Sequence, residues 1–87
     1  MSWQVYILQC RDETLYTGIT DDLERRISRH NAGKGAKYTR GRGPVKLVYR
    51  EECDDKSHAL KREHAIKAMT RTEKLALTAN FCLKEDL

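Results

Sequence analysis

The chain has 87 residues, of which 34% are charged and 39% are hydrophobic, and its formal net charge is +4. That length suits one domain with a modest core, and no apolar run is long enough to span a bilayer or to act as a secretory leader. We therefore expect a cytoplasmic protein, and the composition argues against membrane and secreted classes.

The positive charge is concentrated in one third of the chain. Residues 25–50 contain nine Lys or Arg and no acidic residue. The rest of the chain contains the other eight basic residues and all 13 acidic residues, so it is net negative. A block of this kind attracts a polyanion, because phosphates bound by the protein release their counterions. The block predicts nucleic-acid binding, and the alternative is a solvated basic face.

The cysteines do not indicate a metal centre or a disulfide framework. Cys10, Cys53 and Cys82 are odd in number and widely spaced, and no pair has the close spacing of a zinc site. We expect small buried or half-buried thiols in a reducing compartment.

The first elements in the chain are predicted to form a β-hairpin. Residues 3–8 alternate in the two-residue period of a strand, and residues 15–19 are rich in β-branched and aromatic residues. Tyr6 and Tyr16 share a face of the sheet only if opposed residue numbers sum to an even value, as when Leu8 lies opposite Tyr16. We predict this register, with an odd number of residues in the turn.

A helix is predicted over residues 21–31, where Thr20 and the acids that follow it supply a cap and an acidic first turn. Leu23 and Ile27 define its apolar stripe at 100° per residue. Its basic residues fall into two sets, Arg26 and His30 beside the stripe and Arg25 and Arg29 toward solvent.

Residues 32–43 are predicted to form a flexible loop, because they hold four of the five glycines of the chain with cations interleaved. The cations are Lys34, Lys37, Arg40 and Arg42. We interpret this loop as a phosphate-contacting flap that orders on substrate. Tyr38 would either stack on a base or pack on the domain.

Two helices and one strand complete the predicted elements. Pro44 marks the entry to a third strand over residues 45–50. A second helix is predicted over 57–69, and a capping box at Thr70–Glu73 starts a third helix.

The expected fold class is therefore α+β, with a small three-stranded antiparallel sheet flanked by about three helices. Leu75 and Phe81 are expected to pack on its core. We expect a single domain over residues 1–80 and a C-terminal tail over 81–87.

Glu63 breaks the pattern of the second helix. It falls between Leu60 and Ile66 in azimuth, and a carboxylate on an apolar face is costly unless it is paired or bound to a metal. The alternatives are a buried ion pair, for example with Arg26, or a side chain that reaches solvent. Taken with the other motifs, a metal ligand is the better interpretation.

These motifs together resemble the signature of the GIY-YIG nuclease superfamily. The matching residues are Val5-Tyr6-Ile7, Tyr16-Thr17-Gly18, Asp22-Leu23-x-x-Arg26, His30-Asn31 and Glu63. The chain is most similar to small stand-alone bacterial members of the YhbQ type, from Trp3 to about Leu77. The resemblance implies a GIY-YIG-like α/β sandwich.

The resemblance also implies an endonuclease that depends on a divalent metal, Mg²⁺ or Mn²⁺. Tyr16 or Tyr6 would orient or deprotonate the attacking water, and Arg26 would bind the scissile phosphate. His30 would assist the general base, and Glu63 would be the single metal ligand. All five side chains should then meet in one solvent-reachable hollow.

The implied substrate is nucleic acid, and we expect DNA. The expected substrate-binding residues are Gly18, Arg25, Arg29, Lys34, Lys37, Tyr38, Arg40 and Arg42. Gly18 would let the backbone approach the site. The chain leaves no room for a separate DNA-reading domain, so we expect little sequence specificity and a role in DNA repair or processing.

Three departures from the family pattern concern activity. Val5 replaces the first glycine of the signature, and Ile19 stands where some relatives carry a basic residue. A late asparagine has no counterpart except Asn80, which is a candidate only by its place in the sequence. The alternatives are a non-catalytic nucleic-acid-binding module and a small basic protein-interaction domain. The nuclease is favoured because a pure binding module needs only the cations.

Overall fold

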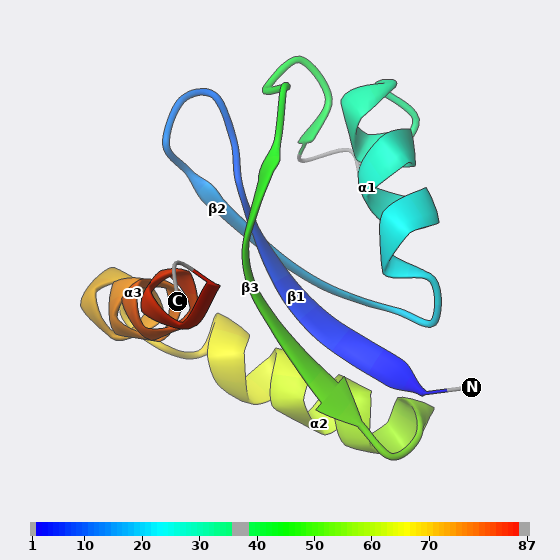
Figure 1. Ribbon diagram of the computed structural model, residues 1–87, viewed down its shortest axis with the longest axis vertical. Helices are drawn as coiled ribbons and strands as arrows, with labels where there is room; N and C mark the ends of the chain where they lie inside the picture. Colours follow the sequence, from blue (N-terminus) through cyan, green and yellow to red (C-terminus); the bar gives the residue numbers. More distant parts are fainter. Residues whose placement is uncertain (1, 36–38, 86–87) are drawn as a thin grey trace.

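The computed structural model describes residues 2–35 and 39–85, which form a three-stranded sheet and three helices (Figure 1). In chain order the elements are β1 (Trp3–Gln9), β2 (Leu15–Thr20), α1 (Leu23–Asn31), β3 (Lys46–Cys53), α2 (Lys56–Lys67) and α3 (Arg71–Glu85). The sheet is antiparallel with strand order β2-β1-β3. The predicted α+β class is confirmed.

The hairpin has the predicted register. Leu8 lies opposite Tyr16 and Tyr6 lies opposite Gly18, so both tyrosines project from one face of the sheet. The turn over residues 10–14 is closed by the Cys10 N–H, which donates to the Thr14 carbonyl at 2.9 Å.

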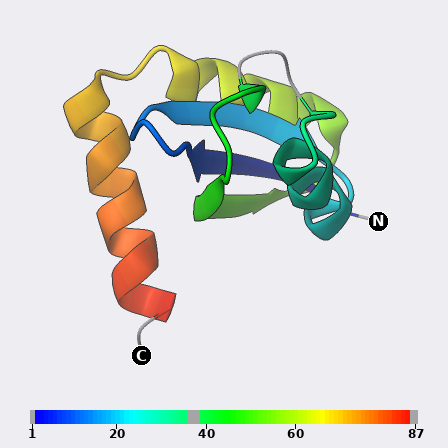
Figure 2. The same cartoon turned by 90° about the horizontal axis from the view of Figure 1, so that it is seen from above.

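The helices cover the sheet from two sides, as Figure 1 and the turned view in Figure 2 show. α1 packs on the face that carries Tyr6 and Leu8, through Leu23. α2 and α3 pack on the face that carries Val5 and Ile7, where they form a second apolar cluster. β1 is the central strand, so each of its side chains belongs to one of two cores.

Side-chain caps define where the helices begin. α1 begins at Leu23 because Asp22 is its N-cap and accepts the Arg25 N–H at 3.2 Å. The capping box of α3 is confirmed, since the Thr70 N–H donates to Glu73 Oε1 at 3.0 Å and the Glu73 N–H donates to Thr70 Oγ1 at 3.2 Å.

The third strand and the third helix are longer than their sequence patterns indicated. β3 runs to Cys53 instead of ending at residue 50, because β1 continues to supply it with pairing partners as far as Trp3. α3 continues to Glu85, past the expected domain end at residue 80.

The apolar face of α2 is narrower than predicted. Ala59 and Ile66 are fully buried, whereas Leu60 is 46% exposed. α2 rests on the sheet through the stripe at Ala59 and Ile66, and Leu60 lies about 100° around the helix from Ala59. Glu63 is therefore at the boundary of the buried face and not in its middle.

The predicted packing of α3 is half right. Leu75 is exposed, so its assignment to the core was wrong. Phe81 is partly buried and packs edge-on against Tyr49, with 6.1 Å between the ring centroids. None of the helices in residues 2–35 and 39–85 is both long enough and apolar enough to cross a membrane.

Substitutions on α2 test the width of its buried face. Ile66→Ala should lower the free energy of unfolding by about 2 to 5 kcal/mol, because it leaves a cavity in a fully buried position. Leu60→Ala should lower it by less than about 1 kcal/mol, because that side chain is largely solvated. Urea unfolding followed by far-UV circular dichroism measures both, and equal losses would contradict this packing.

Candidate active site

The two tyrosines of the hairpin lie side by side, with 6.3 Å between their ring centroids. Gly18 makes this possible. A Cβ at position 18 would lie 2.6 Å from the Tyr6 hydroxyl oxygen and 3.0 Å from the Tyr16 ring. Gly18 was expected to let a substrate approach the backbone, but the space above it is taken by Tyr6. Its observed role is to seat the Tyr6 phenol.

α1 adds a guanidinium and an imidazole to the tyrosine pair. The Tyr6 hydroxyl lies 3.1 Å from His30 Nε2 and accepts the Arg26 Nε–H at 3.4 Å. The His30 ring centroid is also 5.3 Å from that of Tyr16. The predicted spacing of Arg26 and His30 therefore brings both side chains to the tyrosines of the sheet.

These groups form two layers rather than one open hollow. Tyr6 is 0% exposed and His30 is 1% exposed, so neither can touch solvent in this conformation. Tyr16, Arg26 and Glu63 are half-buried and reach the surface. The expectation that all five side chains share a solvent-reachable hollow is corrected in this respect, because the sheet and α1 close over two of them.

Sequence reasoning missed two residues that hold His30. Thr39 is buried, and its Oγ1 lies 2.8 Å from His30 Nδ1. Gly35 also packs against His30, where an added Cβ would collide with the imidazole ring. Both residues lie in the glycine-rich loop, which has no hydrophobic period to indicate which residues turn inward.

The hydrogen bonds around Tyr6 define where its proton goes. Burial raises the pKa of Tyr6, so the phenol is protonated at neutral pH. Because Arg26 Nε–H can only donate, the Tyr6 O–H is free to donate to His30 Nε2. The His30 Nδ1–H then donates to Thr39 Oγ1. Burial, and then the nearby Arg26 charge, lower the pKa of His30, which favours this neutral imidazole.

Arg26 joins the buried layer to the surface. Its hydrogen bond to Tyr6, with a smaller contribution from Tyr16, raises the pKa of its guanidinium. It also lines a surface hollow of about 270 Å³ together with Arg25 and Arg29, which we call the arginine hollow. The other residues lining it are Thr20, Asp21 and Asp22. The three guanidinium groups outnumber the two carboxylates of this lining, so its net charge is positive and suited to phosphate oxygens.

Glu63 lies within electrostatic reach of this cluster, because its negative charge contributes to raising the pKa of Tyr6. Its side chain is only 19% exposed, and its ion-pair partner among the described residues is Lys67, at 3.4 Å from Nζ to Oε2. The alternative pairing with Arg26 is not formed there.

The donor set at Glu63 fits a hard divalent cation held by a single carboxylate. The described residues contain no group of three or more His, Cys, Asp or Glu that could form a metal cage. Mg²⁺ nevertheless commonly keeps several water ligands and uses substrate phosphates, so a single carboxylate can serve as its protein ligand.

Three of the four loop cations lie within the described residues. Lys34 and Arg40 are exposed. Arg42 forms an ion pair with Asp12 in the hairpin turn at 2.5 Å, and its carbonyl accepts the Arg11 N–H at 2.7 Å. Lys37 and Tyr38, which were expected to contact substrate, lie outside the described residues.

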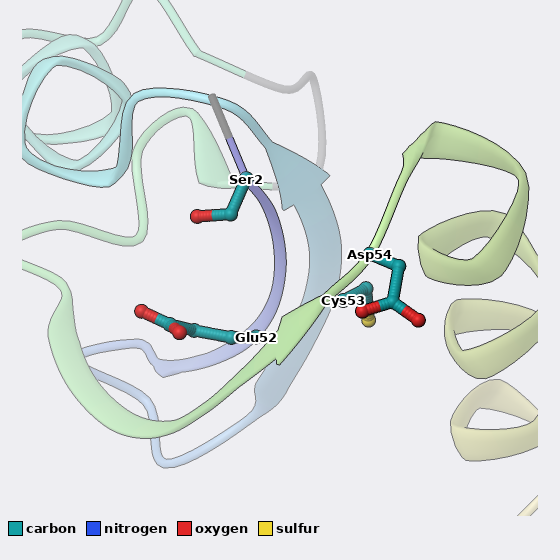
Figure 3. Close-up of a pocket in the computed structure, with 4 residues that line it drawn as sticks. All are labelled: Ser2, Glu52, Cys53 and Asp54. Atoms are coloured by element: carbon teal, nitrogen blue, oxygen red, sulfur yellow. The ribbon is translucent and has the colours of Figure 1, made fainter.

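A larger hollow, of about 530 Å³, lies at the C-terminal end of β3 and carries none of this chemistry (Figure 3). It is lined by Ser2, Glu52, Cys53 and Asp54. Its two carboxylates would repel a polyanion. Cys53 and Cys10 are buried free thiols, as expected.

Comparison with known proteins identifies the family to which this chain belongs. Residues 2–76 match the family model of the GIY-YIG catalytic domain. The UPF0213 protein CPE1444 of Clostridium perfringens is 58% identical over 82 residues, covering 94% of this chain and 88% of that protein. The UPF0213 protein NP_0776A of Natronomonas pharaonis is 58% identical over 76 residues, covering 87% and 89%.

Solved structures agree with this assignment. The solution structure of the UPF0213 protein BH0048 from Bacillus halodurans has a TM-score of 0.59 and 47% identity, covering 91% of this chain and 84% of that one. The solution structure of EF2693 from E. faecalis has a TM-score of 0.64 and 40% identity, covering 95% and 88%. The chain therefore belongs to the GIY-YIG family, a family of nuclease-type catalytic domains, and within it to the UPF0213 group.

Proposed function

We propose that the protein hydrolyses phosphodiester bonds in nucleic acid with the help of a divalent metal ion, and that DNA is its substrate. The observation that carries this proposal is the two-layered site. A phenol, a guanidinium and a carboxylate reach the surface above a buried Tyr6–His30–Thr39 hydrogen-bond chain. A module that only binds nucleic acid needs surface cations, whereas this site also holds a half-buried phenol and a half-buried carboxylate.

Tyr16 is the phenol assigned to the attacking water. Sequence reasoning left this role open between Tyr6 and Tyr16. Tyr6 is fully buried and already hydrogen bonded, which supports giving the role to the partly exposed Tyr16. Tyr16 also contributes to the raised pKa of Arg26, so this phenol lies close to the guanidinium that would bind the phosphate.

Arg26 binds the scissile phosphate. Its guanidinium carries several N–H donors, and the Nε–H is held by Tyr6, so the terminal NH₂ groups can face the phosphate oxygens. The buried layer thus sets the orientation of a guanidinium that would stabilise the transition-state charge. His30 and Thr39 act through Tyr6 and are positioning residues.

Glu63 would hold the divalent ion. When bound, such an ion would offset negative charge on the phosphate during hydrolysis. One carboxylate makes a weak site, so binding of the ion should require substrate phosphates. Recognition through the arginine hollow would read the backbone rather than base sequence, which supports weak sequence specificity and a role in DNA repair or processing.

Surface groups of the site should be essential for cleavage. Tyr16→Phe and Glu63→Gln should each lower Mg²⁺-dependent cleavage of branched, nicked or single-stranded DNA at least 100-fold, because each removes a group at the reacting phosphate. Tyr49→Phe is the matched control, since its ring packs against Phe81 outside the cluster. Wild-type rates in both site variants would refute this assignment.

The pH dependence of cleavage should report His30. A neutral imidazole is needed, so activity is retained above the folded-state pKa of His30 and is lost as the pH falls through it. Because burial and Arg26 lower that pKa, the acid limb should lie below about 6.5, the ordinary histidine value. A pH–rate profile measured under single-turnover conditions checks this, and an acid limb above that value would be inconsistent with the role.

Thr39 should control the tautomer of His30. Thr39→Val should lower the single-turnover rate about two- to tenfold, the effect of one lost hydrogen bond. Thr39→Ser should restore it, and the ¹⁵N shifts of the imidazole should show mixed tautomers only in the Val variant. If Val and Ser behave alike, Thr39 has no such role.

A further inference from the structure

A second surface hollow adjoins Tyr16, between β2 and the helices α2 and α3. It lies where β2, the end of α2 and the start of α3 meet, and its volume is about 230 Å³. The residues that line it are Leu15, Tyr16, Thr17, Lys67 and Lys74, and we call it the lysine hollow. It shares Tyr16 with the cluster described above, while the arginine hollow shares Arg26. The Arg26–Tyr16 pair therefore separates two basic hollows.

Both lysines can take an anion. Lys67 is 54% exposed, and its ion pair with Glu63 at 3.4 Å joins neighbouring turns of α2, a type of pair that water and salt weaken. Lys74 forms no ion pair within the described part of the chain. The carboxylate of its neighbour Glu73 is occupied by the Thr70 cap.

The other walls of the hollow suit a nucleoside better than a simple ion. Leu15 and Tyr16 supply apolar and aromatic surface beside the two ammonium groups. A nucleotide combines a phosphate, which ammonium groups attract, with a sugar and a base, which pack on apolar and aromatic surface.

We propose that the lysine hollow is a second nucleotide subsite, which binds the nucleotide next to the scissile phosphate on the side opposite to the arginine hollow. This inference rests on the proposed function. The strand then crosses the Arg26–Tyr16 pair, with α1 guanidinium groups on one side and Lys67 and Lys74 on the other. Both lysines lie outside the basic block at residues 25–50, which is why charge patterning did not indicate them.

Binding measurements can isolate the subsite from catalysis. Lys67→Gln and Lys74→Gln are compared with Lys61→Gln, an equal loss of charge at an exposed position of α2 outside the hollow. The probe is a fluorescein-labelled single-stranded DNA 12-mer in EDTA, where no cleavage occurs, and anisotropy is measured at several salt concentrations. Each hollow variant should weaken binding about fivefold or more and lower the salt slope by about 0.7. Lys61→Gln should do neither, and Lys74→Arg should restore binding.

The outcomes separate this inference from the proposed function. If the hollow variants match Lys61→Gln while the wild-type protein still cleaves DNA with Mg²⁺, the subsite is refuted and the hydrolase stands. If binding depends on the two lysines but no divalent ion supports cleavage, the subsite stands and the hydrolase is refuted. A wild-type protein that binds no DNA at physiological salt would overturn both.

Discussion

The hydroxyl group of Tyr6 is the point on which this structure depends. It lies in the central strand, over Gly18 of β2, and it is hydrogen bonded to Arg26 and His30 of α1. The sheet and the helix are thus joined by a polar contact inside the core, where a phenol left without partners would destabilise the fold. The same contact orients the groups that face a substrate, so folding and site assembly share one requirement.

Much of this arrangement follows from spacing alone. Two tyrosines with even residue numbers lie on one face only if the numbers of each pair of opposite residues add up to an even value. The hairpin has that register. Residues four apart on α1 lie on one face of the helix, so Arg26 and His30 reach the sheet together. These predictions succeed because strand and helix periods are local properties that a sequence displays directly.

What the sequence could not predict depends on contacts between distant segments. The depth difference between Tyr6 and Tyr16 arises because α1 covers one phenol and leaves the other at an edge strand. Thr39 and Gly35 sit in a loop without a repeating pattern, and only the folded chain brings them onto His30. The assignment of Leu60 to the buried face was wrong, because the angular position of residues around a helix gives the centre of its buried stripe but not the width of that stripe.

The glycine-rich loop, expected to order only when substrate binds, is held at two described points. Thr39 contacts His30, and Arg42 pairs with Asp12 at the tip of the hairpin. Moving Thr39 away from His30 would leave the Nδ1–H of the imidazole without this acceptor. The position of Thr39 and the protonation state of His30 are consequently coupled, because the same hydrogen bond contributes to both. A ligand that kept Thr39 in this place would therefore also stabilise the neutral imidazole.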